Sequence, residues 1–372
     1  MKLTIQKNEL LPVLAKVQGL TGRKTNLAIT TNLLIKTTDS GISISATDLE
    51  TGFEGIYPAN VESQGTIAIN ARKFYEIVRD FPSEEIGLNE IENHWIEIGN
   101  EHVEYHIVGM NPDDFPEIPK IEAVEFFEID SGAMAKMIER AVIVSGATDD
   151  KRAHIMGVYS ERIIEKEQKI FRLVSTDGSR LSKIDYFYDK DYKLPEGTGL
   201  MVPKKGLIEL NKFLDAEGLV QMGFKDNNLI VQKDAETLII RLLEGSFPEY
   251  ADIVQKSAGN DIYLDRQLFL MMLKRMSILS SEDYKGVIFN FSKDKLVITS
   301  TNPDIGESKE DMGIEFRGEP ITVMFNPRFF IDTLGVMDDE KVLIHIVNEE
   351  KPCLIEGEDD KTYLSVIMPM RI

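Results

Sequence analysis

The segment Val174-Ser175-Thr176-Asp177 ends an apolar, strand-like run, and it decides the fold because its pattern occurs three times. Similar segments are Ser45–Asp48 and Thr299–Asn302, so the three threonines stand 129 and 125 residues apart. Three copies at a spacing near one third of the chain indicate an internal repeat. A threefold repeat favours a shape that does mechanical work over a single catalytic centre.

Two further features recur in the same order. Helix starts are predicted around Ala71, Pro203 and Pro327, and proline suits the first helical turn, where its missing N–H has no partner anyway. The first two repeats close on the similar turns Asp114–Glu117 and Ser246–Glu249. We therefore predict three similar domains, covering residues 1–122, 123–253 and 254–372.

Composition excludes several classes of protein. The chain of 372 residues is 42% hydrophobic, yet no apolar run approaches the length of a membrane span. The strand-like start Met1–Ile5 lacks the long apolar stretch of a signal peptide. A lone cysteine, Cys353, fits a reducing compartment, so we expect a cytoplasmic protein.

Charge is distributed unevenly along the chain. The formal net charge is −21, but the six predicted helical windows contain 13 Lys or Arg and only 5 Asp or Glu. This predicts surfaces of opposite sign, with basic helices and acidic strands. The alternative is that helices merely favour Lys and Arg. The windows are 8–17, 70–79, 133–142, 203–212, 266–275 and 326–335.

Apolar spacing predicts the layers of each domain. Met134, Met137, Ile138 and Ala141 show the i, i+3, i+4, i+7 spacing of a helix with one buried face. Short apolar or alternating runs around the windows predict strands. We therefore predict an α+β fold in which two helices of each domain lie on one face of its strands. The runs include 41–45, 238–242, 296–299 and 342–346.

Catalytic and metal signatures are weak. Gly19–Thr25 has the wrong spacing for a phosphate loop. His102 and His106 lie four apart in a segment that alternates like a strand, which predicts solvent-facing side chains rather than a metal site. We therefore predict no catalytic residue, metal ligand or cofactor, and no enzymatic activity. Asp48, Asp177 and Asn302 are a tempting triple for a metal site, but they occupy equivalent positions of separate repeats.

The chain resembles, over its whole length, the bacterial β sliding clamp, the processivity subunit of DNA polymerase III. The resemblance implies three domains of the DNA clamp fold, each with two helices on curved antiparallel sheets. It also implies a head-to-tail homodimer whose six-domain ring encircles duplex DNA without sequence specificity. The most specific segments are Met1–Ile5 followed by Leu10 and Leu11, then Ala46–Glu50, Thr176–Leu181, Val202–Gly206 and Met368–Arg371.

The resemblance further implies an apolar pocket that captures short motifs of partner proteins. The implied partners are DNA polymerase III and other polymerases, the clamp loader and repair proteins of the bacterial replisome. The matching pocket residues are Arg152, Ile155, Thr176, Gly178, Arg180, Leu181, Pro248, Ile253, Val366 and Met368. A neighbouring subsite would use Ser179, Asn326, Phe329, Pro369, Met370 and Arg371.

DNA contact and dimer formation are implied at other positions. The expected DNA-facing residues are Arg23, Lys24, Arg72, Lys73, Lys136, Arg140, Arg152, Lys204, Lys205, Lys274 and Arg275. The expected subunit interface joins Tyr105 and Ile107 of one edge to Ile278 and Leu279 of the other. The chain departs from relatives at Ser179, Asp252, Ala153, His154, His102 and Glu104, which affects the pocket rim, one DNA contact and the interface charges.

Two alternatives belong to other functional classes. A sequence-specific DNA-binding protein would need a base-reading helix or zinc pattern, and competition by unrelated DNA would reveal it. A DNA-processing enzyme would need clustered carboxylates, and a magnesium-dependent nuclease assay would reveal it.

Overall fold

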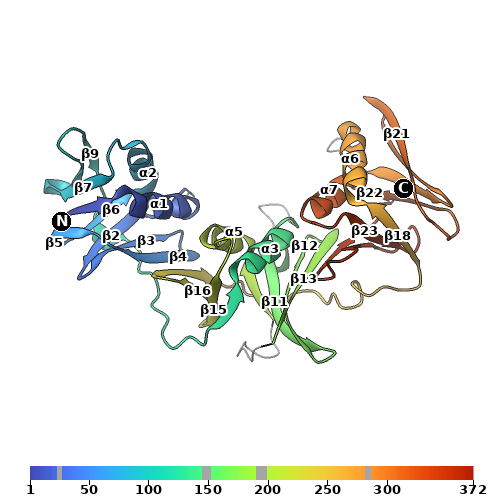
Figure 1. Cartoon of the computed structure of the whole chain (residues 1–372), viewed down its shortest axis with the longest axis horizontal. Coiled ribbons are helices and arrows are strands. Elements are labelled where there is room, and N and C mark those ends of the chain that lie inside the picture. Colours follow the sequence, from blue (N-terminus) through green and yellow to red (C-terminus); the bar gives the residue numbers. More distant parts are fainter. Residues whose placement is uncertain (23–26, 145–151, 190–198, 281–285, 372) are drawn as a thin grey trace. The chain divides into compact units, whose positions relative to one another are not determined.

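The computed structural model describes residues 1–22, 27–144, 152–189, 199–280 and 286–371 (Figure 1). These residues fall into two compact units, which are considered separately. Within the described ranges, unit 1 draws on Met1–Ala135 and Lys205–Leu242, and unit 2 draws on Lys136–Lys190, Gly197–Lys204 and Leu243–Ile372.

Unit 1 contains two antiparallel sheets. The smaller has the strand order β5-β1-β7-β8-β9, and the larger has the order β10-β15-β16-β17-β4-β3-β2-β6. The smaller sheet consists of β1 (Lys2–Gln6), β5 (Asn60–Ser63), β7 (Glu85–Glu90), β8 (Trp95–Gly99) and β9 (Glu104–Val108). The larger consists of β2 (Asn32–Thr38), β3 (Gly41–Thr47), β4 (Thr51–Tyr57), β6 (Thr66–Asn70), β10 (Phe127–Asp130), β15 (Leu219–Lys225), β16 (Asn228–Lys233) and β17 (Glu236–Arg241).

The helices of unit 1 bury one apolar face each. Helices α1 (Lys7–Thr21) and α2 (Ala71–Asp80) pack against each other (Figure 1). The Asn70 side chain caps α2 by accepting the Lys73 N–H at 3.0 Å. The division between the two units falls inside two further helices, α3 (Ser131–Val142) and α5 (Lys204–Phe213), so each contributes residues to both units.

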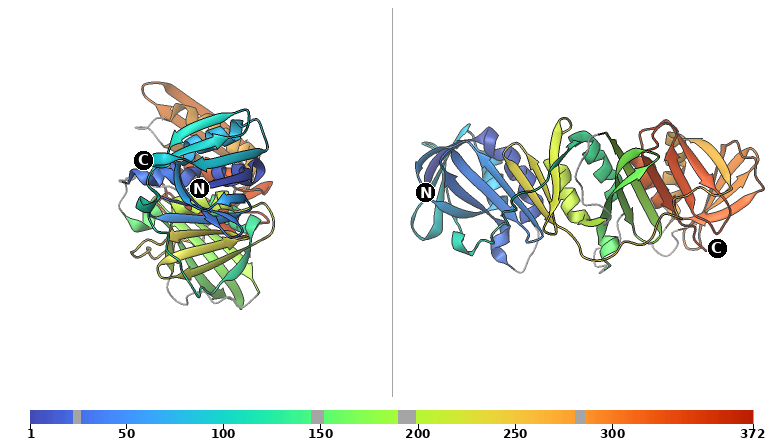
Figure 2. Two further views of the ribbon diagram at one scale, coloured as in Figure 1. Left: turned by 90° about the vertical axis from the view of Figure 1, so that its left-hand side faces the viewer. Right: turned by 90° about the horizontal axis from the view of Figure 1, so that it is seen from below.

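Unit 2 has the same kind of layers, and Figure 2 shows its twisted strands from two further directions. Its larger sheet has the order β14-β11-β12-β13-β25-β24-β23-β18, and its smaller sheet has the order β21-β20-β19-β22. The larger consists of β11 (Gly157–Glu165), β12 (Gln168–Thr176), β13 (Arg180–Tyr188), β14 (Leu200–Pro203), β18 (Asn260–Asp265), β23 (Lys341–Ile346), β24 (Cys353–Gly357) and β25 (Tyr363–Ile367). The smaller consists of β19 (Val287–Ser292), β20 (Lys295–Asn302), β21 (Gly306–Gly313) and β22 (Ile321–Phe325).

Helices α6 (Arg266–Met276) and α7 (Pro327–Gly335) pack together in unit 2 around buried Phe269 and Phe330, whose ring centroids are 6.0 Å apart. The remaining short helices are α4 (Ala153–Met156) and the 3₁₀ turns η1 (Ala28–Thr31), η2 (Glu92–His94), η3 (Pro112–Asp114) and η4 (Ser277–Leu279).

All six predicted helical windows fall on α-helices, and the apolar stripe of Met134, Met137, Ile138 and Ala141 is buried. The prediction for Pro203 was wrong by one residue, because Pro203 ends β14 and α5 begins at Lys204. None of the described helices is both long and apolar enough to cross a membrane.

The strand prediction around His102 was also partly wrong. His102 lies in a turn before β9, where the Asn100 side chain accepts the backbone N–H groups of His102 and Val103 at 2.9 and 3.0 Å. An Asn side chain that satisfies successive N–H groups favours a turn over continued pairing. Only His106 lies on the strand.

Candidate partner-binding pocket and basic helices

The repeated Thr-Asp segment forms a tight turn between β12 and β13. The Thr176 hydroxyl donates to the Arg180 carbonyl at 2.8 Å and accepts the Gly178 N–H at 3.1 Å. The Asp177 carboxylate accepts the N–H groups of Ser179 and Arg180 at 2.9 and 3.0 Å. Gly178 has a φ of 88°, which glycine adopts at little cost. The turn thereby fixes where β13 begins, and so fixes the position of Leu181 in that strand.

The same hydrogen bonds occur in unit 1. Thr47 donates to the Thr51 carbonyl at 2.9 Å and accepts the Leu49 N–H at 3.0 Å, while Asp48 accepts the N–H groups of Glu50 and Thr51. In the third copy, the Asn302 side chain accepts the Asp304 N–H. Asp48, Asp177 and Asn302, the triple considered for a DNA-processing enzyme, are therefore turn-forming residues whose side chains accept backbone N–H groups.

Arg180 braces the turn from within the protein. Its guanidinium donates to Asp177 Oδ2 at 3.0 Å, Asp332 Oδ2 at 2.7 Å and the Ile143 carbonyl at 2.8 Å. It also lies over the Phe329 ring, 4.5 Å from the centroid. The side chain is only 6% exposed, so Arg180 positions the predicted pocket and offers a ligand little contact surface.

An apolar cluster lies behind this turn. It consists of buried Val174, Leu181, Leu354, Leu364 and Val366, with Tyr159, Phe247, Tyr250 and Val254 packed against it. The Tyr159 and Phe247 rings stack with centroids 5.0 Å apart. Leu181 and Val366 pair directly across β13 and β25. Two residues predicted for the pocket are thus joined by strand pairing, although they stand far apart in the sequence.

A cavity of about 310 Å³ opens beside this cluster in unit 2. Ile253 and Met368 line it and are 40% and 39% exposed, so apolar surface faces outward there. This fits an adaptable apolar binding site. The cavity is lined by Asp252, Ile253, Gln255, Ser257, His345, Val347, Lys351, Pro352, Leu354 and Met368. Sequence reasoning missed His345 and Leu354, because only the pairing of β23, β24 and β25 brings them here.

The remaining predicted pocket residues differ in accessibility. Ile155 is buried, whereas Arg152, Gly178, Ser179 and Pro248 are exposed. In the predicted neighbouring subsite, the Met370 N–H donates to the Met324 carbonyl at 2.8 Å, which ties the chain end to β22. The Asn326 side chain is engaged as the cap of α7. The described exposed residues of this subsite include Met370 and Arg371.

Seven of the predicted DNA-facing cations are exposed, and several are balanced by nearby acids. Arg72 and Lys73 both pair with Glu76, at 3.1 and 2.9 Å, and Arg275 donates to Glu310 at 2.9 Å. Lys136 pairs with Asp338. The exposed predicted residues are Arg72, Lys73, Lys136, Arg152, Lys205, Lys274 and Arg275, and two exposed cations that the prediction omitted are Arg79 and Arg328.

Two predicted DNA contacts are corrected by burial. Arg140 is 3% exposed and donates to Asp360 at 2.7 Å and to the Thr362 hydroxyl at 3.3 Å. Lys204 is 8% exposed and donates to the Ile155 carbonyl at 2.6 Å, and burial lowers the pKa of Lys204 to about 8. Neither side chain can reach a phosphate from there. Arg23 and Lys24 lie outside the described residues.

The predicted interface residues lie at exposed places of their units. Strand β9, which carries Tyr105 and Ile107, ends the strand order of its sheet, and in the described chain it pairs only with β8. Ile278 is 74% exposed, an unusual environment for a large apolar side chain. Leu279 is half-buried, and its carbonyl accepts a bond from Asn302.

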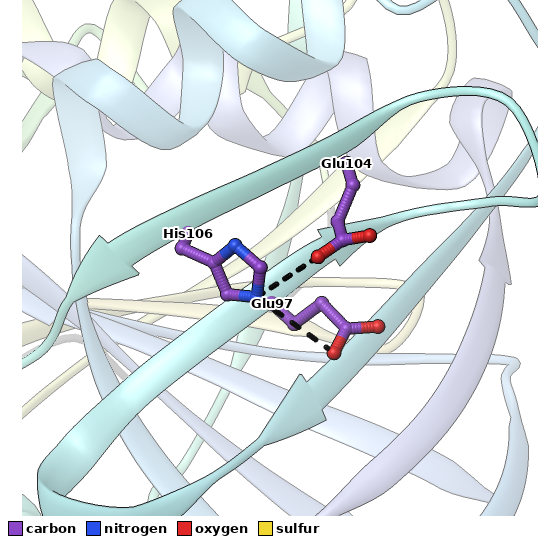
Figure 3. A group of neighbouring side chains, drawn as sticks. All are labelled: Glu97, Glu104 and His106. Carbon is purple, nitrogen blue, oxygen red and sulfur yellow. Dashed lines mark ion pairs between the residues drawn. The ribbon is translucent and has the colours of Figure 1, made fainter.

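His106 lies beside two carboxylates rather than beside His102 (Figure 3). Its Nε2 is 3.1 Å from Glu104 Oε1 and 4.0 Å from Glu97 Oε2. Glu97 pairs directly with His106 across β8 and β9. All three side chains retain access to water, so we interpret the cluster as a surface ion-pair group on the β9 edge.

Three models of the DNA polymerase III beta subunit match the chain in order. They describe its N-terminal, central and C-terminal domains and match residues 1–119, 128–249 and 253–371. Together they span nearly the whole sequence. The chain belongs to the DNA polymerase III beta subunit family.

Individual members of this family are similar to the chain over its full length. The beta sliding clamp of Vibrio cholerae is 28% identical over 376 residues, covering 100% of both chains. A structure described as a putative DNA polymerase III beta subunit from Eubacterium rectale has a TM-score of 0.91 at 28% identity and covers 100% of both chains. A sliding clamp from Pseudomonas aeruginosa bound to griselimycin has a TM-score of 0.90 at 25% identity, again over 100% of both chains.

The structure describes only some of the side chains at which the sequence was expected to depart from the clamp family. Ser179 is exposed at the turn, with its carbonyl accepting the Met368 N–H at 2.9 Å, and Asp252 lines the cavity. Of these two residues, only Asp252 lines the unit 2 cavity. The side chains of Ala153 and His154 lie outside the described structure.

Proposed function

We propose that the chain is a sliding clamp that encircles duplex DNA as a ring-shaped homodimer and tethers the replicative polymerase. The observation that supports this most is the ordered match of three clamp domains through almost the whole chain. Enclosure by a ring retains DNA without strong contacts. Phosphate contacts carry no sequence information directly, so a ring that makes only such contacts can slide.

The charge pattern of the described helices suits loose contact with DNA. Exposed cations such as Lys73, Lys205 and Lys274 supply attraction for phosphates. Acids such as Glu76 and Glu310 balance part of that charge locally. We infer that the helices centre the duplex without holding it at one position. Arg140 and Lys204 are not part of this proposed contact set.

We propose a second role in capturing partners through the unit 2 cavity. Its exposed Ile253 and Met368 would hold the apolar anchor of a short motif. The motif would come from DNA polymerase III, other polymerases, the clamp loader or repair proteins. In this proposal the protein is a non-catalytic replisome component of the cytoplasm. Its domains are those proposed from the sequence, 1–122, 123–253 and 254–372.

Ring assembly is the first requirement of the proposal, and it can be measured directly. Two chains of 42.1 kDa should sediment as a dimer of about twice that mass. Replacing Ile278 and Leu279 with Lys should give monomers, because charged side chains at an apolar contact lose their hydration. The control changes exposed Ile305 to Lys. A wild-type chain that is monomeric at micromolar concentration would contradict the ring.

A further inference from the structure

A row of directly paired residues crosses five strands of the larger sheet of unit 2. Leu181 pairs with Val366, Val366 with Leu354, and Leu354 with His345. His345 in turn pairs with Asp261 of β18. Directly opposed residues of antiparallel strands project from the same face of a sheet. The apolar row behind the cavity therefore ends in two polar residues.

His345 is the buried member of this polar end. Its side chain is 6% exposed, and Nδ1 lies 2.7 Å from Asp261 Oδ1. An ionised carboxylate only accepts hydrogen bonds, so Nδ1 carries a proton in this pair. In the tautomer with this single ring proton, Nε2 is an acceptor. Among the described residues, nothing forms a hydrogen bond with His345 Nε2. A buried acceptor without a donor is unfavourable until a partner arrives.

We propose that His345 sets the ligand selectivity of the cavity lined by Ile253, Leu354 and Met368. The apolar anchor of a peptide fills the cavity, and a donor group beside the anchor, such as a side-chain amide, bonds Nε2. The inference rests on the proposed function, because it assumes that this cavity takes a peptide. It adds a specificity-determining residue that the sequence did not indicate.

Access to Nε2 requires a small movement of the segment above it. A Cβ added to Gly259 would stand 2.9 Å from Nε2, so the Gly259 backbone lies against this edge of the ring and any side chain there would crowd it. Residues 255–258 form no backbone-to-backbone hydrogen bond within the described structure. The ion pair of Lys256 Nζ with Glu356 Oε1, at 2.9 Å, holds this segment to β24. A segment held by one partly exposed ion pair can yield to a ligand at low cost.

The experiment compares fluorescent peptides taken from the clamp-binding segment of the cognate polymerase. At each position flanking the apolar anchor in turn, one peptide carries Gln and its match carries Met, which has similar size but no donor. Affinities are measured by anisotropy for the full-length wild-type protein, for His345→Phe and for the matched control His102→Phe. At one flanking position, wild type and control should favour Gln by roughly tenfold, and His345→Phe should favour it by less than about twofold.

The outcomes separate this inference from the proposed function. Equal affinities for Gln and Met peptides in wild type, or a preference that survives His345→Phe, would overturn the role of His345 and leave the peptide pocket standing. A wild-type protein that binds none of the peptides would overturn both proposals.

Two further measurements guard against a misfolded variant. Gly259→Ala leaves the histidine in place but crowds Nε2, so it should also remove the preference for Gln. In the wild type, which has five histidines, ¹⁵N-histidine NMR should show the His345 Nε2 resonance moving on addition of the preferred peptide. A preference unaffected by Gly259→Ala, or an unchanged Nε2 resonance at saturation, would contradict direct bonding.

Discussion

The turn after β3 in unit 1 and the turn after β12 in unit 2 have the same hydrogen bonds but different surroundings. Strand pairing extends the equivalence: Gly52 pairs with Ile239 as Leu181 pairs with Val366. The preceding residues of the two turns continue this match, because Thr51 pairs with Ile240 as Arg180 pairs with Ile367. The residues that follow Ile240 and Ile367, Arg241 and Met368, are therefore equivalent. The two regions therefore share one backbone frame and differ in the side chains placed on it.

Those side chains decide what each region can bind. A Cβ at Gly52 would meet Ile118 Cγ2 at 2.9 Å, so the chain itself covers the position that Leu181 occupies in unit 2. A cavity beside the unit 1 turn is lined by acids, amides and Arg241, and also by apolar residues. The polar residues include Glu50, Asp226 and Asn227, and the apolar ones are Leu49, Pro116, Pro119 and Ile239. The cavity of unit 2 presents Ile253 and Met368. A repeated fold thus supplies a repeated frame, while the binding function depends on particular residues.

Removing Met368–Ile372 is expected to have the largest effect on peptide affinity. The truncation removes Met368, an exposed lining residue of the unit 2 cavity, and the hydrogen bond from the Met370 N–H to the Met324 carbonyl. Loss of several apolar contacts should weaken binding of a fluorescent polymerase-derived peptide by about 100-fold or more. The unit 1 control Arg241→Ala should bind normally. Unchanged affinity after truncation, with dimer mass preserved, would place the site elsewhere.

Exchanging the residues of the two equivalent positions sharpens the test with less disturbance. Met368 is 39% exposed, so Met368→Arg should fold normally yet weaken peptide binding by about tenfold, because a charge would face an apolar anchor. Arg241→Met should change affinity by less than about twofold, since the acids Glu50, Glu117 and Asp226 still line the unit 1 cavity and would face an apolar anchor. Equal effects of the two substitutions on the titration would mean that unit 1 also binds the peptide.

The first two residues of α5 are a buried lysine, Lys204, and an exposed one, Lys205, which allows the two environments to be compared. Burial holds the pKa of Lys204 near 8, below its unfolded value of 10.5, whereas Lys205 is exposed. Between these pH values the unfolded chain binds more protons, so folding stability should rise with pH, by about 1 kcal/mol between pH 8 and 9. Lys204→Met should remove this rise and Lys205→Met should keep it in urea denaturation. Parallel pH profiles for all three proteins would contradict the assignment.

The smallest expected effect concerns the turns themselves. Leu49 has a φ of 78° where the unit 2 turn has Gly178, and this conformation is strained for leucine. Leu49→Gly should raise the free energy of unfolding by about 0.5 kcal/mol, because relief of strain outweighs the added chain entropy. Gly178→Ala should lower it by about 1 kcal/mol. Denaturant midpoints measure both changes, and shifts of the same sign would show that the turns are not equivalent.

Local patterns predicted the elements of this fold well. The spacing of residues such as Phe269, Met272 and Leu273 identified a buried helical face, and each helical window was confirmed. The Thr-Asp segments identified the repeat because each turn uses its own side chains to satisfy nearby amides. Such features depend on residues a few positions apart, which a sequence displays directly.

The candidate site was less predictable because it depends on distant residues. Arg140 and Lys204 looked like surface cations, but their partners Asp360 and the Ile155 carbonyl are supplied by other segments. His345 drew no attention because only strand pairing places it beside Leu354. Burial and register are properties of the folded chain, so charge and spacing alone could not assign these roles.

The most direct test of the account is the lifetime of the protein on DNA of different topology. The wild-type protein is placed on a nicked circular plasmid by its clamp loader, freed of loader, and followed before and after one restriction cut. Enclosure predicts long retention on the circle at moderate salt and rapid loss from the cut ends, irrespective of DNA sequence. Equal lifetimes on circular and linear DNA would contradict the sliding clamp.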